Sequence, residues 1–345
     1  WITAPTIMRR LSYISIIIGF LFHGAGLCAR MYIMQRPPVS TLYESIIFVA
    51  FIAILAAIIL EIIRKDGLGI LIGAISGSIF HYIGFKYAVD GDTMGMLVAV
   101  LNSNFWLATH VTTITIGYGT SLMAGFMGHV YLGIAILFPE RTTQLKEIYN
   151  NSFGITLLAL FFSLFGTILG GIWADQSWGR FWGWDPKENG AMLICMWHLM
   201  MIHMRLTGMI KGPGFALGMI INNIIVALAW FGVNLLNVGL HSYGFATGIA
   251  VNLGLFILFE FVVGIGSYFW ANSKQKLLAR NSAISASMDK SIVSARGHKF
   301  SDETRFPIII GDYMESRNGS DEKYDLESFH KGIRSWARIL AELAN

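Results

Sequence analysis

Long apolar runs separated by short polar loops dominate the first 271 positions of the chain. A helix needs about 20 mostly apolar residues to cross a bilayer. Eight runs meet this requirement, and they cover residues 11–33, 44–63, 67–85, 105–138, 152–173, 188–208, 214–235 and 248–271. The pattern therefore predicts an all-α, polytopic integral membrane protein with about eight transmembrane helices.

The hydrophobic pattern changes at residue 272, where mixed charge with Ser, Asn and Gly replaces the apolar runs. Near the end of the chain, Leu326, Phe329 and Ile333 follow helical spacing and predict one amphipathic helix. The chain is therefore expected to consist of a transmembrane domain over residues 1–271 and a soluble, solvated tail over residues 272–345.

Basic residues indicate the orientation of the predicted spans, because cytoplasmic loops carry an excess of Lys and Arg. With eight crossings, most basic residues fall on one side: Arg9, Arg10, Arg64, Lys65, Arg141, Lys146, Arg205, Lys211, Lys274, Lys276 and Arg280. Both termini are therefore predicted to be cytoplasmic. The outward segments are then residues 34–43, 86–104, 174–187 and 236–247.

Composition agrees with this assignment and excludes several classes of protein. Hydrophobic residues make up 54% of the chain and charged residues 13%, whereas about a quarter of a soluble chain is charged. No basic patch is interleaved with aromatic residues, so nucleic acid is not expected as a partner. Cys28 and Cys195 each stand alone in an apolar run, which excludes a disulfide framework and a CxxC thiol relay. The start at Trp1 is typical of a processed chain, a fragment or the later part of a fusion.

The outward segment WADQSWGRFWGWDPKENG, at about residues 173–190, is unusually rich in tryptophan. A single Trp at this depth is typical of the aromatic belt at a membrane interface. Four indoles with glycines between them form a broader apolar surface, which suits a planar macrocycle. These indoles belong to Trp173, Trp178, Trp182 and Trp184.

Polar residues of the same segment have two predicted roles. Some carry charge for a ligand, and others mark the start of the next helix. Arg180 and Lys187 are suited to neutralise the carboxylates of an anionic ligand through charge-assisted hydrogen bonds. Asp185 and Pro186 predict a turn into the sixth span, with Asp185 capping its first turn.

Histidines near this segment are candidates for holding the iron of a porphyrin, because imidazole is a common iron ligand. His110 and His241 lie at outward ends of the predicted topology and can approach the tryptophans. A lone histidine at an interface is also commonly a hydrogen-bonded structural residue, so both interpretations stand at this point. His198 and His203 lie within the sixth span, where an ionisable residue suggests function. Their spacing of five turns them to different faces.

Several of these segments resemble one protein family. The run WGRFWGWDPKENGA resembles the WWD signature of haem-handling proteins, and its WGWDPKE form is typical of the CcsA/ResC family of cytochrome c synthases. The contexts LNSNFWLATHV and VGLHSYGF are similar to the family segments that carry the outward histidine ligands. HGAGLCARMYIMQRPPVSTLYES is similar to the family's first span and following loop.

The resemblance implies a set of haem ligands. It makes His110 and His241 the two axial ligands of haem b at an outer site beside the tryptophans. His203 matches the family's intramembrane histidine, which forms an inner half-site because its second ligand comes from the CcsB part. His198 has no counterpart in the family and is expected to be structural, whereas His129 stays an alternative in-chain partner for His203.

The resemblance also implies an activity and a location. The chain would be a cytochrome c synthase subunit of the bacterial inner membrane, with its WWD loop facing the periplasm. It would present reduced haem for thioether attachment to the CxxCH motif of apocytochrome c, together with a CcsB/ResB-like membrane protein and thiol-reducing relay proteins. Its catalytic contribution would be positioning, which is able to lower a barrier by roughly 7–11 kcal/mol, and no catalytic acid, base or nucleophile is expected.

Three other functions are compatible with parts of this pattern. A haem exporter or chaperone of the CcmC type would bind haem without ligating it. A b-type electron-transfer subunit would hold haem between histidines on facing spans. A solute transporter would use the tryptophans only as an interfacial belt.

Overall fold

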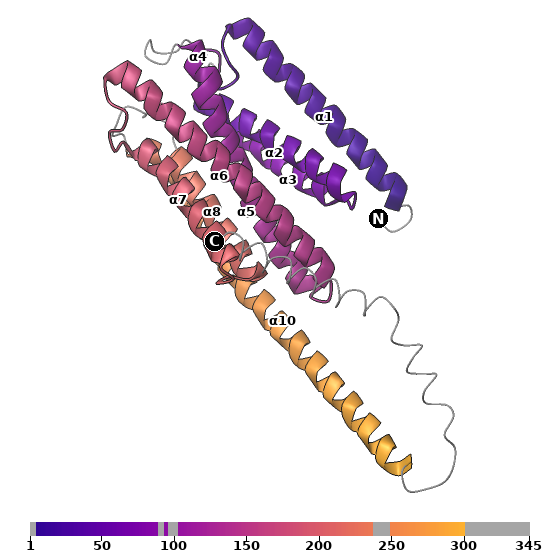
Figure 1. Cartoon of the computed structure of the whole chain (residues 1–345). Helices are drawn as coiled ribbons and strands as arrows, with labels where there is room; N and C mark the ends of the chain where they lie inside the picture. Colours follow the sequence, from indigo (N-terminus) through magenta and orange to yellow (C-terminus); the bar gives the residue numbers. More distant parts are fainter. Residues whose placement is uncertain (1–4, 89–92, 96–102, 237–248, 301–345) are drawn as a thin grey trace, which may run out of the picture. The chain divides into compact units, whose positions relative to one another are not determined.

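The computed structural model describes residues 5–88, 93–95, 103–236 and 249–300, and within these residues the regular structure is helical (Figure 1). The longer helices are α1 (Pro5–Met34), α2 (Leu42–Arg64), α3 (Leu68–Ala88), α5 (Thr112–Leu137), α6 (Thr142–Trp178), α7 (Pro186–Leu206), α8 (Gly212–Ala227) and α10 (Ile249–Phe300). Short segments extend two of them: α4 (Asn104–Trp106) and the π-helix η2 (Leu107–Val111) lead into α5, and the π-helix η3 (Leu228–Gly232) and α9 (Val233–Leu235) continue α8.

These helices confirm the predicted all-α membrane architecture. Each of the eight predicted spans coincides with a helical segment. Among the described residues, seven segments are long and apolar enough to cross a membrane. The predicted sixth span, α7, falls outside that set because polar and charged residues occupy both of its ends. The chain is a multi-pass membrane protein.

The chain divides into two compact units, Trp1–Ala279 and Arg280–Asn345. The first unit contains helices α1 to α9 and the first part of α10. In the second unit, the structure describes residues 280–300, which form the last turns of α10.

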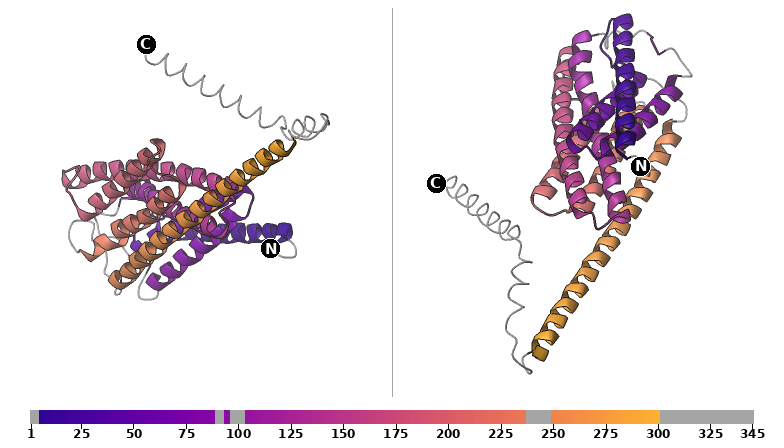
Figure 2. Two further views of the ribbon diagram at one scale, coloured as in Figure 1. Left: turned by 90° about the horizontal axis from the view of Figure 1, so that it is seen from below. Right: turned by 90° about the vertical axis from the view of Figure 1, so that its right-hand side faces the viewer.

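Helices α5, α6, α7 and α8 pack as one group in the first unit (Figures 1 and 2). Helix α5 packs against α6 and α8, and α7 packs against the same two helices. Helix α2 packs against α5 and α3, and α1 covers α2 and α3. Buried apolar residues such as Met127, Leu132 and Ile220 fill the core of this bundle.

Glycines allow α5 to approach both of its neighbours closely. A Cβ atom added to Gly166 of α6 would lie 2.8 Å from the Cα atom of Ile114. A Cβ atom added to Gly128 of α5 would lie 2.5 Å from the backbone oxygen of Ala216 in α8. Small residues at such contacts are typical of helix packing in membranes. They bring the α5 and α6 backbones together next to His110.

Polar contacts fasten α10 to this bundle within apolar surroundings. The Glu260 carboxylate lies 2.8 Å from Nε2 of His129 in α5. Its other oxygen accepts a hydrogen bond of 3.1 Å from Nδ2 of Asn223 in α8. Glu260 is only 4% exposed. A buried carboxylate in a membrane bundle requires such partners, because an unpaired charge is expensive there.

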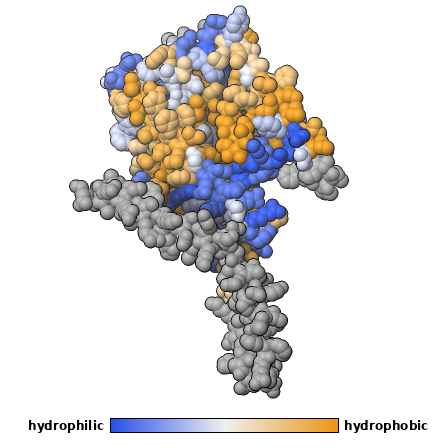
Figure 3. Space-filling model, turned by 45° about the vertical axis from the view of Figure 1, so that its right-hand side comes forward, coloured by the Kyte–Doolittle hydropathy of each residue, from blue (hydrophilic) through white to orange (hydrophobic). Residues whose placement is uncertain are grey.

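The surface of the bundle is largely apolar, as lipid contact requires. Figure 3 shows apolar residues over much of the face turned to the viewer. Large side chains on α1 and on the first part of α10 are exposed, among them Leu21, Phe22, Leu255 and Phe259. Exposed apolar side chains on long apolar helices are stable in hydrocarbon and would be unfavourable in water.

Candidate functional site

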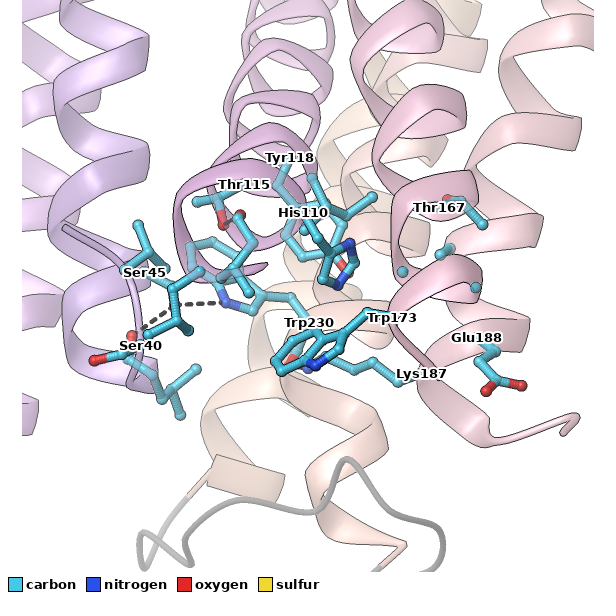
Figure 4. A pocket seen from close by; sticks show the side chains of 18 of the residues that line it. Ser40, Ser45, His110, Thr115, Tyr118, Thr167, Trp173, Lys187, Glu188 and Trp230 are labelled. Carbon is cyan, nitrogen blue, oxygen red and sulfur yellow. Dashed lines mark hydrogen bonds between the residues drawn. The ribbon is translucent and has the colours of Figure 1, made fainter. Parts of the chain in front are cut away.

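A cavity lies beside the two π-helices, next to the start of α2, the last turns of α6 and the start of α7 (Figure 4). It encloses about 180 Å³. Among the residues that line it are His110, Tyr118, Trp173, Trp182, Lys187 and Trp230. Figure 4 shows the His110 ring and the Trp173 indole close together, with Trp230 on another wall.

His110 is placed by the π-helix η2 that carries it. Its Nδ1 atom lies 2.8 Å from the backbone oxygen of Gly166 in α6. Because a carbonyl oxygen only accepts hydrogen bonds, Nδ1 carries the proton and Nε2 holds the lone pair. A hydrogen bond from one ring nitrogen to a backbone carbonyl is the arrangement in which histidines bind metals. Single π-turns in helices are also frequent at functional sites.

A pair of stacked indoles lies on one side of the His110 ring. The Trp173 indole packs edge-on to it, with ring centroids 5.7 Å apart. Trp106 stacks on Trp173 at 6.2 Å with an interplanar angle of 11°. A Cβ atom added to Gly170 would lie 2.6 Å from Cε1 of His110, so a side chain there would displace the ring. The imidazole is therefore held on one side by the Trp173 indole and on another by the α6 backbone at Gly170.

The structure shortens the predicted tryptophan loop. Helix α6 continues to Trp178, and α7 begins at Pro186. Trp173 and Trp178 are therefore helical, and the connection holds only residues 179–185. The predicted helix end lies too early because three polar residues, Asp175, Gln176 and Ser177, interrupt the apolar run after Ala174, although α6 continues through them to Trp178.

Two acidic residues fix the α6–α7 connection. Asp185 caps α7 as predicted, accepting a hydrogen bond of 2.7 Å from the backbone of Lys187. The Glu188 carboxylate accepts hydrogen bonds from the backbone N–H groups of Gly183, at 2.7 Å, and of Asp185, at 3.2 Å. Arg180 pairs with the same carboxylate at 3.3 Å. Among the described contacts, Arg180 is thus engaged within the loop.

The two tryptophans of this connection differ in exposure. Trp182 lines the cavity, and its buried Nε1 has no hydrogen-bond partner among the residues that the structure describes. Trp184 is 67% exposed and adopts a φ of 58°. A bulky residue in the left-handed region is uncommon and costs conformational energy. The loop therefore turns one indole into the cavity and holds the next one outside.

Lys187 supplies positive charge to the cavity wall. Its Nζ donates a hydrogen bond of 3.0 Å to the backbone oxygen of Trp230. Loss of solvent around the ammonium lowers the pKa of Lys187 to about 8, although the nearby Asp185 acts in the opposite direction. The Trp230 side chain donates through Nε1 to Ser45 Oγ at 3.0 Å. Lys187 therefore links the start of α7 to η3.

The predicted site residues fall into separate groups. His110, Trp173 and Trp182 line one cavity, whereas Trp178, Trp184, Arg180 and Asp185 do not belong to its lining. His203 lies near the other end of α7, where it is exposed and bonds to the Leu199 carbonyl at 2.7 Å. His241 lies outside the described residues.

Sequence reasoning missed three aromatic residues of this region. Trp106 and Trp230 lie near the ends of predicted spans, and Tyr118 lies two turns beyond His110. The sequence did contain one indication of their role. These aromatic residues lie near the same ends of the predicted spans as the candidate histidines. Trp230 and Tyr118 also pack against each other, with centroids 5.9 Å apart.

Replacing Glu188 by alanine is expected to loosen the α6–α7 connection. The substitution leaves the N–H groups of Gly183 and Asp185 without their acceptor, and a hydrogen bond to a charged group contributes about 1.5–3 kcal/mol. Amide hydrogen exchange in the purified chain should become about tenfold faster or more at residues 182–185. Glu188→Gln, which keeps an acceptor oxygen, should show a smaller change. Equal exchange in all three proteins would exclude this role for Glu188.

Comparisons with known proteins identify the family of the chain. A model of the cytochrome c assembly protein family matches residues 39–241, a range that includes the whole cavity lining. The CcsA cytochrome c biogenesis protein of Chlamydomonas reinhardtii is 33% identical over 220 residues, covering 60% of this chain and 61% of that protein. The CcsA protein of Chlorella vulgaris is 30% identical over 271 residues, covering 66% of this chain and 86% of that protein.

A longer relative is the NrfI protein of Wolinella succinogenes, which is 32% identical over 244 residues. The match covers 66% of this chain but only 25% of NrfI. The chain thus spans a quarter of NrfI and less than two thirds of the Chlamydomonas protein. The family match extends over more than half of the chain, and the chain belongs to the cytochrome c assembly protein family, among the CcsA biogenesis proteins.

Proposed function

We propose that the chain is the haem-presenting subunit of a cytochrome c synthase in a bacterial inner membrane. The observation that carries this proposal is the joint placement of His110, Trp173, Trp182 and Lys187 around one cavity. Family membership supports a role in cytochrome c biogenesis and the handling of haem. Haem b is the substrate that the subunit delivers.

The cavity suits one edge of a haem group. Its volume of about 180 Å³ is below the roughly 300–1,000 Å³ of pockets that enclose a whole ligand. The indoles of Trp173 and Trp182 offer apolar faces to a macrocycle. A haem held by one edge keeps its opposite edge accessible to a second protein, as attachment to apocytochrome c requires.

Charge in the cavity suits the carboxylates of haem. Among the described residues that line the cavity, Lys187 is the cation, whereas Arg180 is engaged by Glu188. The sequence offered both residues as partners for carboxylates. The contacts favour Lys187 for a propionate that reaches into the cavity, with Arg180 stabilising the loop.

His110 is the proposed axial ligand from the described part of the site. Its Nδ1–H is fixed on the Gly166 carbonyl, which directs the lone pair of Nε2 toward a ligand role. His241 is the proposed second axial ligand, and it follows the described end of α9 by six residues. Both histidines lie within the family match.

The proposed reaction needs positioning more than acid–base chemistry. Each cysteine thiol of the CxxCH motif adds across one haem vinyl group, so that a C–S bond forms and the thiol hydrogen moves to the adjacent carbon. No electrons are gained or lost in this addition. The protein holds the haem while the two thiols approach. The substrate histidine then replaces one of the enzyme's axial ligands, which releases the product.

The proposed inner site depends on a partner. His203 is exposed on α7, so a ligand from a CcsB/ResB-like protein is able to approach it from outside the bundle. His129 instead bonds to Glu260 of α10, and no contact among the described residues joins it to His203. These contacts favour a partner ligand over the alternative of an in-chain pair. Thiol-reducing relay proteins would keep the apocytochrome cysteines reduced.

Spectra of the purified chain test the haem site. His110→Ala is expected to lower the bis-imidazole haem content at least tenfold, because one of two axial bonds is removed. Thr109→Ala is the matched control, since Thr109 neighbours His110 and, among the described contacts, its side-chain hydroxyl donates only to the Phe105 carbonyl. Unchanged haem content in His110→Ala would exclude His110 as a ligand.

Co-expression separates a synthase from a haem exporter of the CcmC type. The chain, a CcsB/ResB-like protein and a CxxCH reporter would be produced in a host without its own maturation system. Covalent haem on the reporter is the expected result, and Trp182→Ala should reduce it. Haem-loaded chain without covalent haem on the reporter would contradict the synthase function.

A further inference from the structure

Two histidines meet in the membrane part of the bundle, away from the residues that line the cavity. His23 of α1 and His81 of α3 have ring centroids 4.5 Å apart and an interplanar angle of 69°. Phe51 of α2 packs edge-on to His23 at 5.4 Å. The pair therefore lies at the junction of three helices, with an aromatic ring on one side.

The hydrogen bonding of this pair is incomplete. Both ring nitrogens of His23 are buried, and among the described residues their one polar contact is a weak interaction with the backbone of Ile47 that does not reach ordinary hydrogen-bond geometry. Nδ1 of His81 donates to the Gly77 carbonyl at 2.7 Å. A buried polar atom without a partner costs about 1–3 kcal/mol. Such an atom at membrane depth calls for a functional explanation.

The spacing of the rings limits what the pair is able to bind. With metal–nitrogen bonds of about 2.0 Å, a tetrahedral angle places two imidazole centroids about 5 Å apart. Opposite axial positions on a haem iron place them about 6 Å apart. The observed 4.5 Å is closer to the tetrahedral value. The pair as it stands is too narrow to hold haem between its rings, which also counts against a b-type electron-transfer site here.

The geometry points to a metal site in which His23 and His81 supply two imidazole ligands to a closed-shell transition-metal ion. Nε2 of His81 is the ligand atom, because its Nδ1–H bond to the Gly77 carbonyl matches the usual support of a metal-binding histidine. One ring nitrogen of His23 is the other. Imidazole binds copper and zinc well. His81 is exposed, so an ion held by this pair would be accessible from the outside of the bundle.

Charge favours the cuprous ion over zinc at this site. Among the described contacts, no carboxylate or thiolate reaches either ring, and neutral imidazoles do not compensate the charge of a cation. A divalent ion would therefore place two uncompensated charges in apolar surroundings, whereas Cu⁺ would place one. This site is independent of the proposed haem function, since neither histidine lines the cavity.

Metal titration of the purified full chain tests the site. The haem-free protein in detergent would be titrated anaerobically with Cu⁺ against a chromogenic chelator, and with Zn²⁺ in a second series. The natural chain is expected to bind one equivalent of Cu⁺ through these two histidines, and this binding should weaken in His23→Phe and in His81→Ala. The affinity of this equivalent should fall at least tenfold in each variant, and the double variant should lose no more than either single one.

Matched variants separate ligation from folding. His23→Phe keeps an aromatic ring against Phe51, and His81→Cys replaces one metal ligand by another and should retain Cu⁺. Tyr82→Phe, beside His81, should bind like the natural chain. Equal stoichiometry in the natural chain and both histidine variants would overturn the site. Binding of Zn²⁺ without Cu⁺ would overturn the assignment of the ion.

Discussion

Glu260→Ala is expected to lower the free energy of unfolding of the chain by about 3–5 kcal/mol, the range observed when one partner of a buried pair is removed. Alanine leaves His129 without its carboxylate and Asn223 without the acceptor of its Nδ2. Both groups stay buried or half-buried among apolar helices. The measurement is reversible unfolding in mixed detergent micelles, followed by circular dichroism.

A double-mutant cycle distinguishes pairing from simple loss of packing. His129→Leu combined with Glu260→Leu removes both partners and should cost much less than the sum of the single changes. Glu260→Gln keeps an oxygen for Asn223 and should be milder than Glu260→Ala. Additive effects of the two leucine substitutions would show that the His129–Glu260 contact contributes little.

Gly170→Ala is expected to reduce haem binding by the chain about tenfold or more, which corresponds to about 1.4 kcal/mol. The added Cβ atom would lie 2.6 Å from Cε1 and 3.0 Å from Nδ1 of His110. The imidazole has to move away, and its hydrogen bond to Gly166 is lost with that movement. The measurement is haem titration of the purified protein, read from its absorption spectrum.

Gly154→Ala provides the matched control for this effect. Gly154 lies on the same helix, α6, and a Cβ atom added there meets nothing within 4 Å. The two variants thus share the change in helix propensity and differ only in the contact with His110. Normal haem binding by Gly170→Ala would show that the position of the His110 ring does not govern binding.

The helices of this protein could be predicted because lipid imposes a simple rule. A run of about 20 apolar residues is visible without knowledge of its neighbours, and each of the eight runs is helical. The start of α7 was also predictable, because Asp185 followed by Pro186 is a local capping signal. Such features depend on residues that are adjacent in the sequence.

The arrangement of the site could be predicted only in part, because it depends on contacts between distant segments. The π-helices that contain His110 and Trp230 cannot be recognised from a local sequence pattern. The pairing of Arg180 with Glu188 leaves Lys187 as the cation of the cavity, and only the three-dimensional contacts distinguish the two basic residues. The role of His241 stays a prediction, since it lies outside the described residues.

The π-helix η2 has a consequence for how His110 came to face the cavity. A π-turn corresponds to an α-helix with one extra residue, and each residue of an α-helix advances the side chain by about 100°. One residue inserted within 107–111 therefore rotates the segment before it relative to α5, whose glycine contacts with α6 and α8 keep it in place. A site of this kind is able to arise, or to disappear, by a change in residue number alone, with no change in the chemistry of any side chain.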